Sequence, residues 1–237
     1  MSDARTPSSA IETFADSEAL AQGAADIIAE VLQRRLEDGA ESVRFVATGG
    51  STPIAAYEVL RDWPLDWGRV EITLSDERWA PPSSPDSNEG MLRRQLLTGG
   101  AAAARFTPLW SDEASPEAAA RRAEPLIRRL LPFDVVLLGM GDDGHVASLF
   151  PGSPALAEGL APDGERLCIG APQATLAPMV PRISLTLRAL LDARLVIILT
   201  SGEAKKGLLA AAMHGAQLPV RAVLAQDRAP VRVLWAP

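Results

Sequence analysis

The chain has 237 residues, 47% of them hydrophobic, and a formal net charge of −7 at pH 7. This length and composition exclude a disordered chain and fit one large α/β domain or two small ones with a substantial core. The negative charge argues against nucleic-acid and membrane-surface binding, which need a basic face, but it leaves room for an anionic substrate held by local Arg and Lys side chains.

The cysteine content and the N-terminal sequence indicate the compartment. Cys168 is the only cysteine and cannot form an internal disulfide, which indicates a reducing environment. The first residues, MSDARTPSSAIETF, lack the basic and apolar regions of a signal peptide, and no apolar run approaches the roughly 20 residues of a membrane span. We therefore expect a cytoplasmic protein without a membrane partner, whose residues 1–14 are flexible.

Helical and strand patterns alternate along the rest of the chain. The predicted helices span residues 17–38, 54–61, 88–97, 116–131 and 201–214. The predicted strands span residues 42–48, 70–74, 106–110, 135–138, 166–171, 181–187, 195–200 and 231–235, the last at an edge of the sheet. This alternation predicts a three-layer α/β/α, Rossmann-like fold, in which helices cover both faces of a mostly parallel sheet. Residues 1–237 are expected to form a single domain, with the looser segment 152–180 as a candidate small subdomain or lid.

The stretch 133–154, FDVVLLGMGDDGHVASLFPGSP, carries the strongest chemical signal. A buried strand stops at glycines around Asp142 and Asp143, directly before His145, and open α/β sheets place reactive groups at such strand ends. Imidazole exchanges protons near neutral pH, so His145 is a candidate general base, with Asp143 or Asp142 orienting its ring. The second histidine, His214, is interpreted as a helix C-terminal residue.

Other chemistries fit the sequence poorly. The segment from Gly139 to Gly144 matches the G-x-G-x-x-G pattern of dinucleotide sites, but two carboxylates occupy the loop where a pyrophosphate would lie, and Pro151 interrupts the helix that should follow. Neither a G-x-S-x-G nor a Walker A sequence occurs. One cysteine and two histidines do not suffice for a structural zinc site. We therefore expect neither a metal nor a cofactor.

A second glycine loop follows the strand predicted at 42–48. Gly50, Ser51 and Thr52 precede a helix whose free N–H groups and dipole suit a phosphate. An unliganded helix start with a Ser/Thr cap fits the same pattern equally well.

Cations follow two further predicted strands. Arg78 comes shortly after the strand at 70–74 and suits a carboxylate or phosphate, although a structural ion pair with Asp76 or Glu77 is an alternative. The strand at 195–200 also ends at a small-residue turn followed by lysine. The predicted strand ends thus combine a histidine, a phosphate cradle and positive charge.

Five segments of the sequence carry a family resemblance. They are ATGGSTP (47–53), SDERWAPPSSPDSN (75–88), LLGMGDDGHVASLFPGS (137–153), PRISLTL (181–187) and SGEAKK (201–206). In this order they resemble the 6-phosphogluconolactonase family, within the larger group that includes glucosamine-6-phosphate deaminase/isomerase. The deaminase branch shares the G-x-x-G-H core but typically continues toward Phe-Asn-Glu-Pro where this chain has Ser148 to Pro151, and it usually lacks the Arg-Trp-x-Pro form seen from Arg78 to Pro81. Both departures favour the lactonase.

The resemblance implies hydrolysis of 6-phospho-D-glucono-1,5-lactone to 6-phosphogluconate, in the oxidative pentose phosphate pathway, without a cofactor. It makes His145 the base that activates water and then protonates the departing ring oxygen, with Asp143, or alternatively Asp142, orienting the ring. The implied phosphate contacts are Gly50, Ser51, Thr52, Arg78 and Lys205, with Arg182 as a further contact for the phosphate or the sugar.

Two other functions stay open at this point. An isomerase or deaminase of the larger group would need a carboxylate base near Asp76. A non-catalytic sugar-phosphate sensor would keep the phosphate cradle without needing His145, and would usually carry a DNA-binding segment that we do not find. The expected partner is a small phosphorylated sugar lactone, and the protein is expected to be a monomer or weak homodimer.

Overall fold

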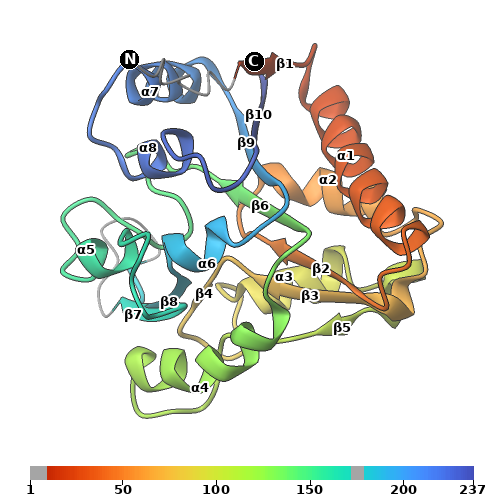
Figure 1. Ribbon diagram of the computed structural model, residues 1–237, viewed down its shortest axis with the longest axis horizontal. Coiled ribbons are helices and arrows are strands. Elements are labelled where there is room, and N and C mark those ends of the chain that lie inside the picture. The colour runs from red at the N-terminus through yellow and green to blue at the C-terminus, as the bar shows by residue number, and fades with distance from the viewer. Residues whose placement is uncertain (1–9, 172–178) are drawn as a thin grey trace, which may run out of the picture.

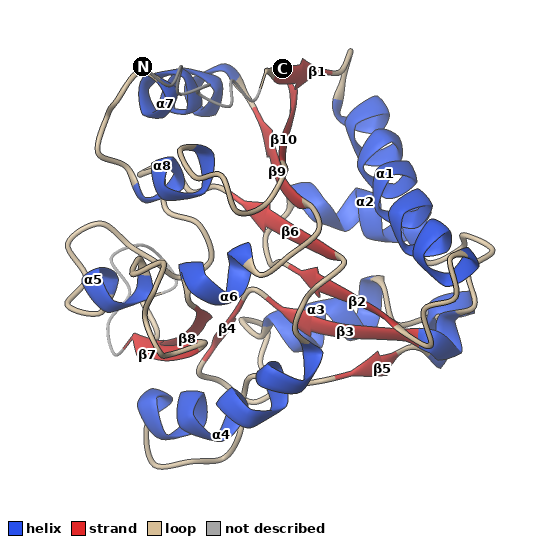
Figure 2. Cartoon of the chain, in the orientation of Figure 1, coloured by secondary structure: helices blue, strands red, loops and turns tan. Residues whose placement is uncertain are grey.

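A seven-stranded parallel sheet forms the centre of the computed structural model, which describes residues 10–171 and 179–237. Its strand order is β1-β10-β9-β6-β2-β3-β5, and each neighbouring pair is parallel (Figure 2). Residues 135–138 of β6 are fully buried, as their continuous apolar run predicts for a strand covered on both faces. The strands are β1 (Ile11–Thr13), β2 (Val43–Ala47), β3 (Val70–Leu74), β5 (Arg105–Phe106), β6 (Val135–Gly139), β9 (Val196–Ser201) and β10 (Val231–Ala236).

Helices cover both faces of this sheet, which confirms the predicted three-layer α/β/α fold (Figure 1). Helices α1 and α2 pack against each other on one face. From β1 to β5 the chain crosses the sheet in one direction, and from β5 to β10 it crosses in the other. Because right-handed crossovers that run in opposite directions lie on opposite faces, the helices after β5, β6 and β9 cover the second face. The helices are α1 (Ser17–Glu37), α2 (Thr52–Leu60), α3 (Asn88–Gln95), α4 (Pro116–Leu130), α5 (Leu156–Gly159), α6 (Leu187–Leu191), α7 (Glu203–Met213) and α8 (Pro219–Leu224).

Local sequence signals explain why the long first helix begins where it does and which face it buries. The Asp16 side chain accepts a hydrogen bond from the Ala19 N–H (2.8 Å), which satisfies one of the unpaired donors of the first turn of α1. Leu20, Ile28 and Leu32 recur at helical spacing, and all three are buried in the core. Within the described part of the chain, none of the helices is sufficiently long and apolar to cross a membrane.

A smaller antiparallel sheet, with the order β4-β8-β7, begins at the carboxyl end of β3 (Figure 2). Its strands are β4 (Asp76–Arg78), β8 (Arg182–Leu185) and β7 (Cys168–Ala171). Helix α4 packs along β7, where the carboxylates of Glu117 and Glu124 accept hydrogen bonds from backbone N–H groups. This edge of the small sheet is therefore covered.

At the ends of the chain one prediction is wrong, and the flexibility expected for residues 1–14 stays a prediction. Strand β10 is not at an edge, because β1 pairs with residues 233–235 on its far side. Residues 11–13 therefore form a strand within the segment expected to be flexible, while residues 1–9 lie outside the described part. Three residues are too few to show a strand pattern, and β1 is stabilised by its partner rather than by its own sequence.

The other differences concern the segments around the small sheet. The charged segment after β3, for which the sequence predicted no element, contains β4, and the strand predicted at 106–110 is confined to Arg105–Phe106. Segment 152–180 contains α5 and β7, and its residues 172–178 lie outside the described part. The single-domain interpretation and the lid role of this segment stay predictions.

The chain changes direction across the main sheet between β2 and β6. From β2 it continues to β3 and β5 on one side, and from β6 it continues to β9 and β10 on the other. Loops that leave such a switch point diverge and open a crevice beyond the carboxyl ends of the strands. The two glycine loops meet there, since a Cβ added at Gly139 would lie 3.9 Å from the carbonyl oxygen of Gly49.

Candidate active site

A cavity of about 270 Å³ lies at this switch point. It is bordered by the loops that follow β2 and β6, by residues of β9, α2, α3 and α7, and by two strands of the small sheet. It collects each predicted site residue except Asp143, which lies behind the histidine. The residues that the sequence singled out and that line it are Gly50, Ser51, Thr52, Arg78, Asp142, His145, Arg182 and Lys205.

Glycines shape the loop that carries His145. A Cβ at Gly141 would lie 2.1 Å from ring atoms of His145, so a side chain here would displace the imidazole. Gly144 has a φ of +78°, a conformation that L-residues with side chains rarely adopt, and a Cβ there would lie 2.9 Å from Leu218. Gly141 is therefore required for the close packing of the ring, and Gly144 for the turn of the loop against Leu218.

The His145 ring is held by one aspartate. Nδ1 lies 2.6 Å from Oδ1 of Asp143, and the same oxygen accepts a hydrogen bond from the backbone N–H of His145 at 3.0 Å. A neutral ring that donates its Nδ1–H to this carboxylate leaves Nε2 unprotonated. The ring of Phe150 lies against the imidazole, with 4.4 Å between the centroids, so His145 is mostly shielded from solvent and its side chain is 19% exposed.

The two neighbouring aspartates, which the sequence could not distinguish, have separate contacts. Asp143 orients the ring, whereas Asp142 is exposed and lies 3.6 Å from Nζ of Lys205. The ammonium of Lys205 thus lies at the cavity beside a carboxylate that a bound anion would have to compete with.

The other glycine loop has the geometry of an anion site. Gly50 has a φ of +104°, which turns the chain into the N-terminus of α2 at the cavity wall. Ser51 occupies the N-cap position but its side chain makes no capping hydrogen bond, so the structure contradicts the alternative of a side-chain-capped helix start. Pro53 has no N–H, and the N–H of Ile54 donates to the carbonyl of Ser51 at 3.3 Å. The groups that remain available to a ligand at this end are the N–H of Thr52 and the hydroxyls of Ser51 and Thr52.

The alternation of side chains along β4 separates its three charges. Asp76 and Arg78 both line the cavity, whereas Glu77 is fully buried on the opposite face. Arg78 donates from Nη1 to the carbonyl of Asp86 at 2.5 Å, and it forms no ion pair with Asp76 or Glu77 in the part of the chain that the structure describes. The ion-pair alternative for Arg78 is therefore wrong.

Glu77 closes the N-terminus of α3. Its carboxylate accepts hydrogen bonds from the N–H groups of Arg78, Asn88 and Glu89 and from the hydroxyl of Ser87. Burial nonetheless raises the pKa of Glu77 to about 7, against the opposing effect of these four donors. Glu77 thus fixes the loop that follows Arg78, and its side chain does not reach the cavity.

Arg182 enters the cavity from the small sheet. It is 4% exposed, its Nε donates to the carbonyl of Val180, and its guanidinium carbon lies 5.8 Å from the centroid of the Phe150 ring. Burial lowers the pKa of Arg182. The Phe150 ring therefore lies close to both the imidazole of His145 and this guanidinium.

Two residues of the site were missed by sequence reasoning. Asn88 borders the cavity, where its side chain donates to the carbonyl of Asp76 (2.9 Å) and would clash with any Cβ at Gly49. Phe150 was quoted within a motif but was given no role. The signals were an asparagine closing a charged segment and an aromatic five residues after His145, neither of which indicates a function without the fold.

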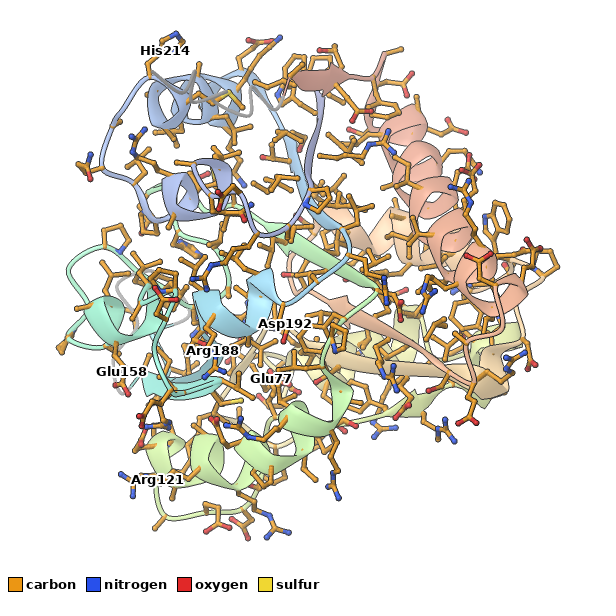
Figure 3. All side chains as sticks on the ribbon, viewed as in Figure 1. Glu77, Arg121, Glu158, Arg188, Asp192 and His214 are labelled. Atoms are coloured by element: carbon orange, nitrogen blue, oxygen red, sulfur yellow. The ribbon has the colours of Figure 1, made fainter. Side chains whose placement is uncertain are left out.

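His214 lies away from this site. It ends α7 at the periphery of the molecule, where its Nδ1 lies 2.7 Å from the carbonyl oxygen of Ala210, as expected for a helix C-terminal residue (Figure 3). Among the described residues, no group of three or more His, Cys, Asp or Glu side chains is arranged to hold a metal ion.

Fold and site together define a class: a parallel α/β protein with a His–Asp pair and a helix N-terminus without a side-chain cap at one cavity of the switch point. The family model for glucosamine-6-phosphate isomerases/6-phosphogluconolactonase matches residues 15–235. The chain is 45% identical to the 6-phosphogluconolactonase of Caulobacter vibrioides, over 95% of this chain and 97% of that one. A crystal structure of a 6-phosphogluconolactonase from Shewanella baltica superimposes with a TM-score of 0.92 at 36% identity, covering 98% of this chain and 99% of the other. The chain belongs to the glucosamine-6-phosphate isomerase/6-phosphogluconolactonase family, which confirms the resemblance.

Proposed function

We propose that the protein hydrolyses 6-phospho-D-glucono-1,5-lactone to 6-phosphogluconate, with His145 as general base. The observation that carries this proposal is the pairing of His145 Nδ1 with Asp143 at a cavity that is also bordered by the uncapped N-terminus of α2. Similarity to 6-phosphogluconolactonases over nearly the whole chain supports this choice of substrate within the family.

The proposed reaction needs one proton carrier. Nε2 of His145 takes a proton from water while the water oxygen bonds to C1 of the lactone and the carbonyl electrons move to their oxygen. When this tetrahedral intermediate collapses, the bond between C1 and the ring oxygen breaks, and the imidazolium returns its proton to that oxygen. Asp143 stabilises the imidazolium between the two steps. A δ-lactone is already an activated ester, so positioning and one base supply the catalysis.

The phosphate in this proposal binds at the N-terminus of α2, where the glycine loop borders the cavity. Gly50, Ser51 and Thr52 supply N–H and hydroxyl donors, and Lys205 adds positive charge. Arg78 and Arg182 line the same cavity and supply positive charge on the side of the small sheet. Because the phosphate does not react, these contacts should act mainly on substrate affinity.

The test is acid release from freshly prepared lactone above the spontaneous rate. His145→Ala is expected to lower this excess rate by about 10²- to 10⁴-fold while 6-phosphogluconate still binds. His214→Ala changes the other histidine, which is exposed, and should behave as wild type. A His145→Ala enzyme with full turnover would contradict the mechanism. If the wild-type enzyme shows no excess hydrolysis and instead releases ammonia from glucosamine 6-phosphate, the deaminase function is supported in place of the lactonase function.

A further inference from the structure

Asp76 lines the cavity and is negatively charged. Asp142 shares this sign, whereas the side chains of Arg78, Arg182 and Lys205 in the same lining are positively charged. Asp76 is 7% exposed, and it is the first residue of β4, directly after the end of the main-sheet strand β3. Neither the His–Asp pair nor the phosphate contacts of the proposed function use it. A carboxylate kept almost buried at a cavity wall requires compensation by hydrogen bonds.

Two serine hydroxyls provide that compensation. Ser75 Oγ donates to Oδ1 of Asp76 at 3.0 Å, and Ser148 Oγ donates to Oδ2 at 2.6 Å. Ser148 belongs to the segment that follows His145, so this contact links the loop of the base to the small sheet. Ser148 is itself fixed by its N–H, which donates to Oγ of Ser184 on β8 at 3.1 Å.

The backbone of Asp76 is held as firmly as its side chain. Its carbonyl accepts a hydrogen bond from Asn88 Nδ2, and its Cα pairs with that of Ser184 in the antiparallel ladder. Three chain segments therefore fix one carboxylate in one orientation. Such preorganisation is typical of a group that recognises a ligand by direction.

The chemistry of the carboxylate selects what it can bind. An ionised carboxylate only accepts hydrogen bonds, and each oxygen can accept two, so one further position is available on each oxygen beyond its serine. It repels a phosphate, which must bind at the other groups of the cavity. The fitting ligand group is a neutral hydroxyl.

We propose that Asp76 accepts a hydrogen bond from one ring hydroxyl of the sugar lactone, and that Ser75 and Ser148 are positioning residues that hold it for this contact. The inference rests on the proposed function, because it assigns a subsite of the same substrate. The inference also distinguishes the lactonase from the isomerase or deaminase alternative. In the lactonase Asp76 binds the substrate, whereas the alternative requires Asp76 to transfer protons.

The experiment combines Asp76→Asn with three substrate analogues, the 2-, 3- and 4-deoxy forms of the phosphorylated lactone. Wild type should lose about 10- to 100-fold in kcat/KM on the one analogue that lacks the recognised hydroxyl, since a hydrogen bond to a charged group is lost. Asp76→Asn should lose a similar factor on the complete lactone but little more on that analogue. Ser148→Ala should show the same selective pattern with a smaller loss, which provides a second variant if Asp76→Asn does not fold.

Several outcomes would overturn the inference. Equal losses of Asp76→Asn on the lactone and on all three analogues would assign Asp76 a structural role. A kcat loss at unchanged KM on every substrate would make it a proton-transfer group. Binding of the product 6-phosphogluconate and of its deoxy forms, measured by calorimetry, gives the same comparison without turnover. Failure of wild type to hydrolyse any lactone would refute the proposed function instead, so the two failures are distinguishable.

Discussion

Asp143→Asn tests how the His145 ring is held. Oδ1 of Asp143 accepts the backbone N–H of His145 at 3.0 Å and lies 2.6 Å from Nδ1. A backbone N–H is always a donor, so the carbonyl oxygen of an asparagine, rather than its NH₂ group, should occupy this position. Nδ1 then keeps an acceptor. The substitution removes the negative charge but preserves the orientation and tautomer of the ring.

The size of the effect follows from this geometry. A hydrogen bond to a charged group contributes about 1.5–3 kcal/mol, and one between neutral groups about 0.5–1.5 kcal/mol. The difference of about 1–1.5 kcal/mol applies when the imidazolium forms, so kcat should fall about 10-fold at nearly constant KM. Asp143→Ala also frees the ring and should lower kcat by about 100- to 1000-fold.

The assay compares initial rates of acid release from fresh lactone, with the spontaneous rate subtracted, for wild type and both variants. Asp142→Asn is the matched control. It removes the same charge from the neighbouring residue, whose side chain is exposed, while Asp143 keeps its contact with the ring. An Asp143→Asn loss as large as that of Asp143→Ala would refute the reasoning, because the asparagine would then have failed to preserve the tautomer. An equal kcat loss in Asp142→Asn would mean that the net charge of the loop, and not the contact between Asp143 and the ring, causes the loss in Asp143→Asn.

The remaining predictions concern the phosphate contacts and the buried glutamate. Lys205→Ala should raise KM about 10- to 100-fold with little change in kcat, since it removes a charged contact to a non-reacting group, and a pure kcat loss would contradict this role. Lys206→Ala is its control, because that ammonium lies over the Trp235 ring, 3.5 Å from its centroid. Burial raises the pKa of Glu77 from 4.5 to about 7, so the folded state binds a proton more tightly than the unfolded state between these values. The free energy of unfolding should therefore fall as pH rises through this window, by on the order of 3 kcal/mol. Urea unfolding of wild type and Glu77→Gln across pH 4.5–8 checks this, since only wild type should show the slope; identical slopes would mean that the four donors, and not burial, set the pKa of Glu77.

Local patterns were sufficient for the parts of the molecule whose structure is determined locally. The apolar run at 135–138 predicted a strand buried on both faces, and the glycines after it predicted a loop at the carboxyl end. The positions of Gly50 and His145 at one cavity then followed, because parallel strands bring their carboxyl ends to one edge of a sheet. The direction of the strands was sufficient to predict the positions of these residues.

Contacts between distant segments could not be predicted in this way. Which aspartate meets His145 depends on the path of a six-residue glycine loop, and the hydrogen bond from Ser148 to Asp76 joins residues 72 positions apart. Strand β1 has three residues and forms because residues 233–235 offer a partner. None of these contacts leaves a periodic signal, since each depends on tertiary packing.

The segment that follows β3 shows how much one missing element changes the interpretation of a site. Read as a loop, Asp76, Glu77 and Arg78 are a charge cluster whose members pair with one another. Read as a strand, they alternate, so that Asp76 and Arg78 face the cavity and Glu77 faces the start of α3. The pairing partner that makes this segment a strand is β8, which lies about 100 residues later and also supplies Arg182. The same ladder that separates the charges therefore brings the second guanidinium to the cavity, and a change that breaks it should affect the positions of Asp76, Arg78 and Arg182 together.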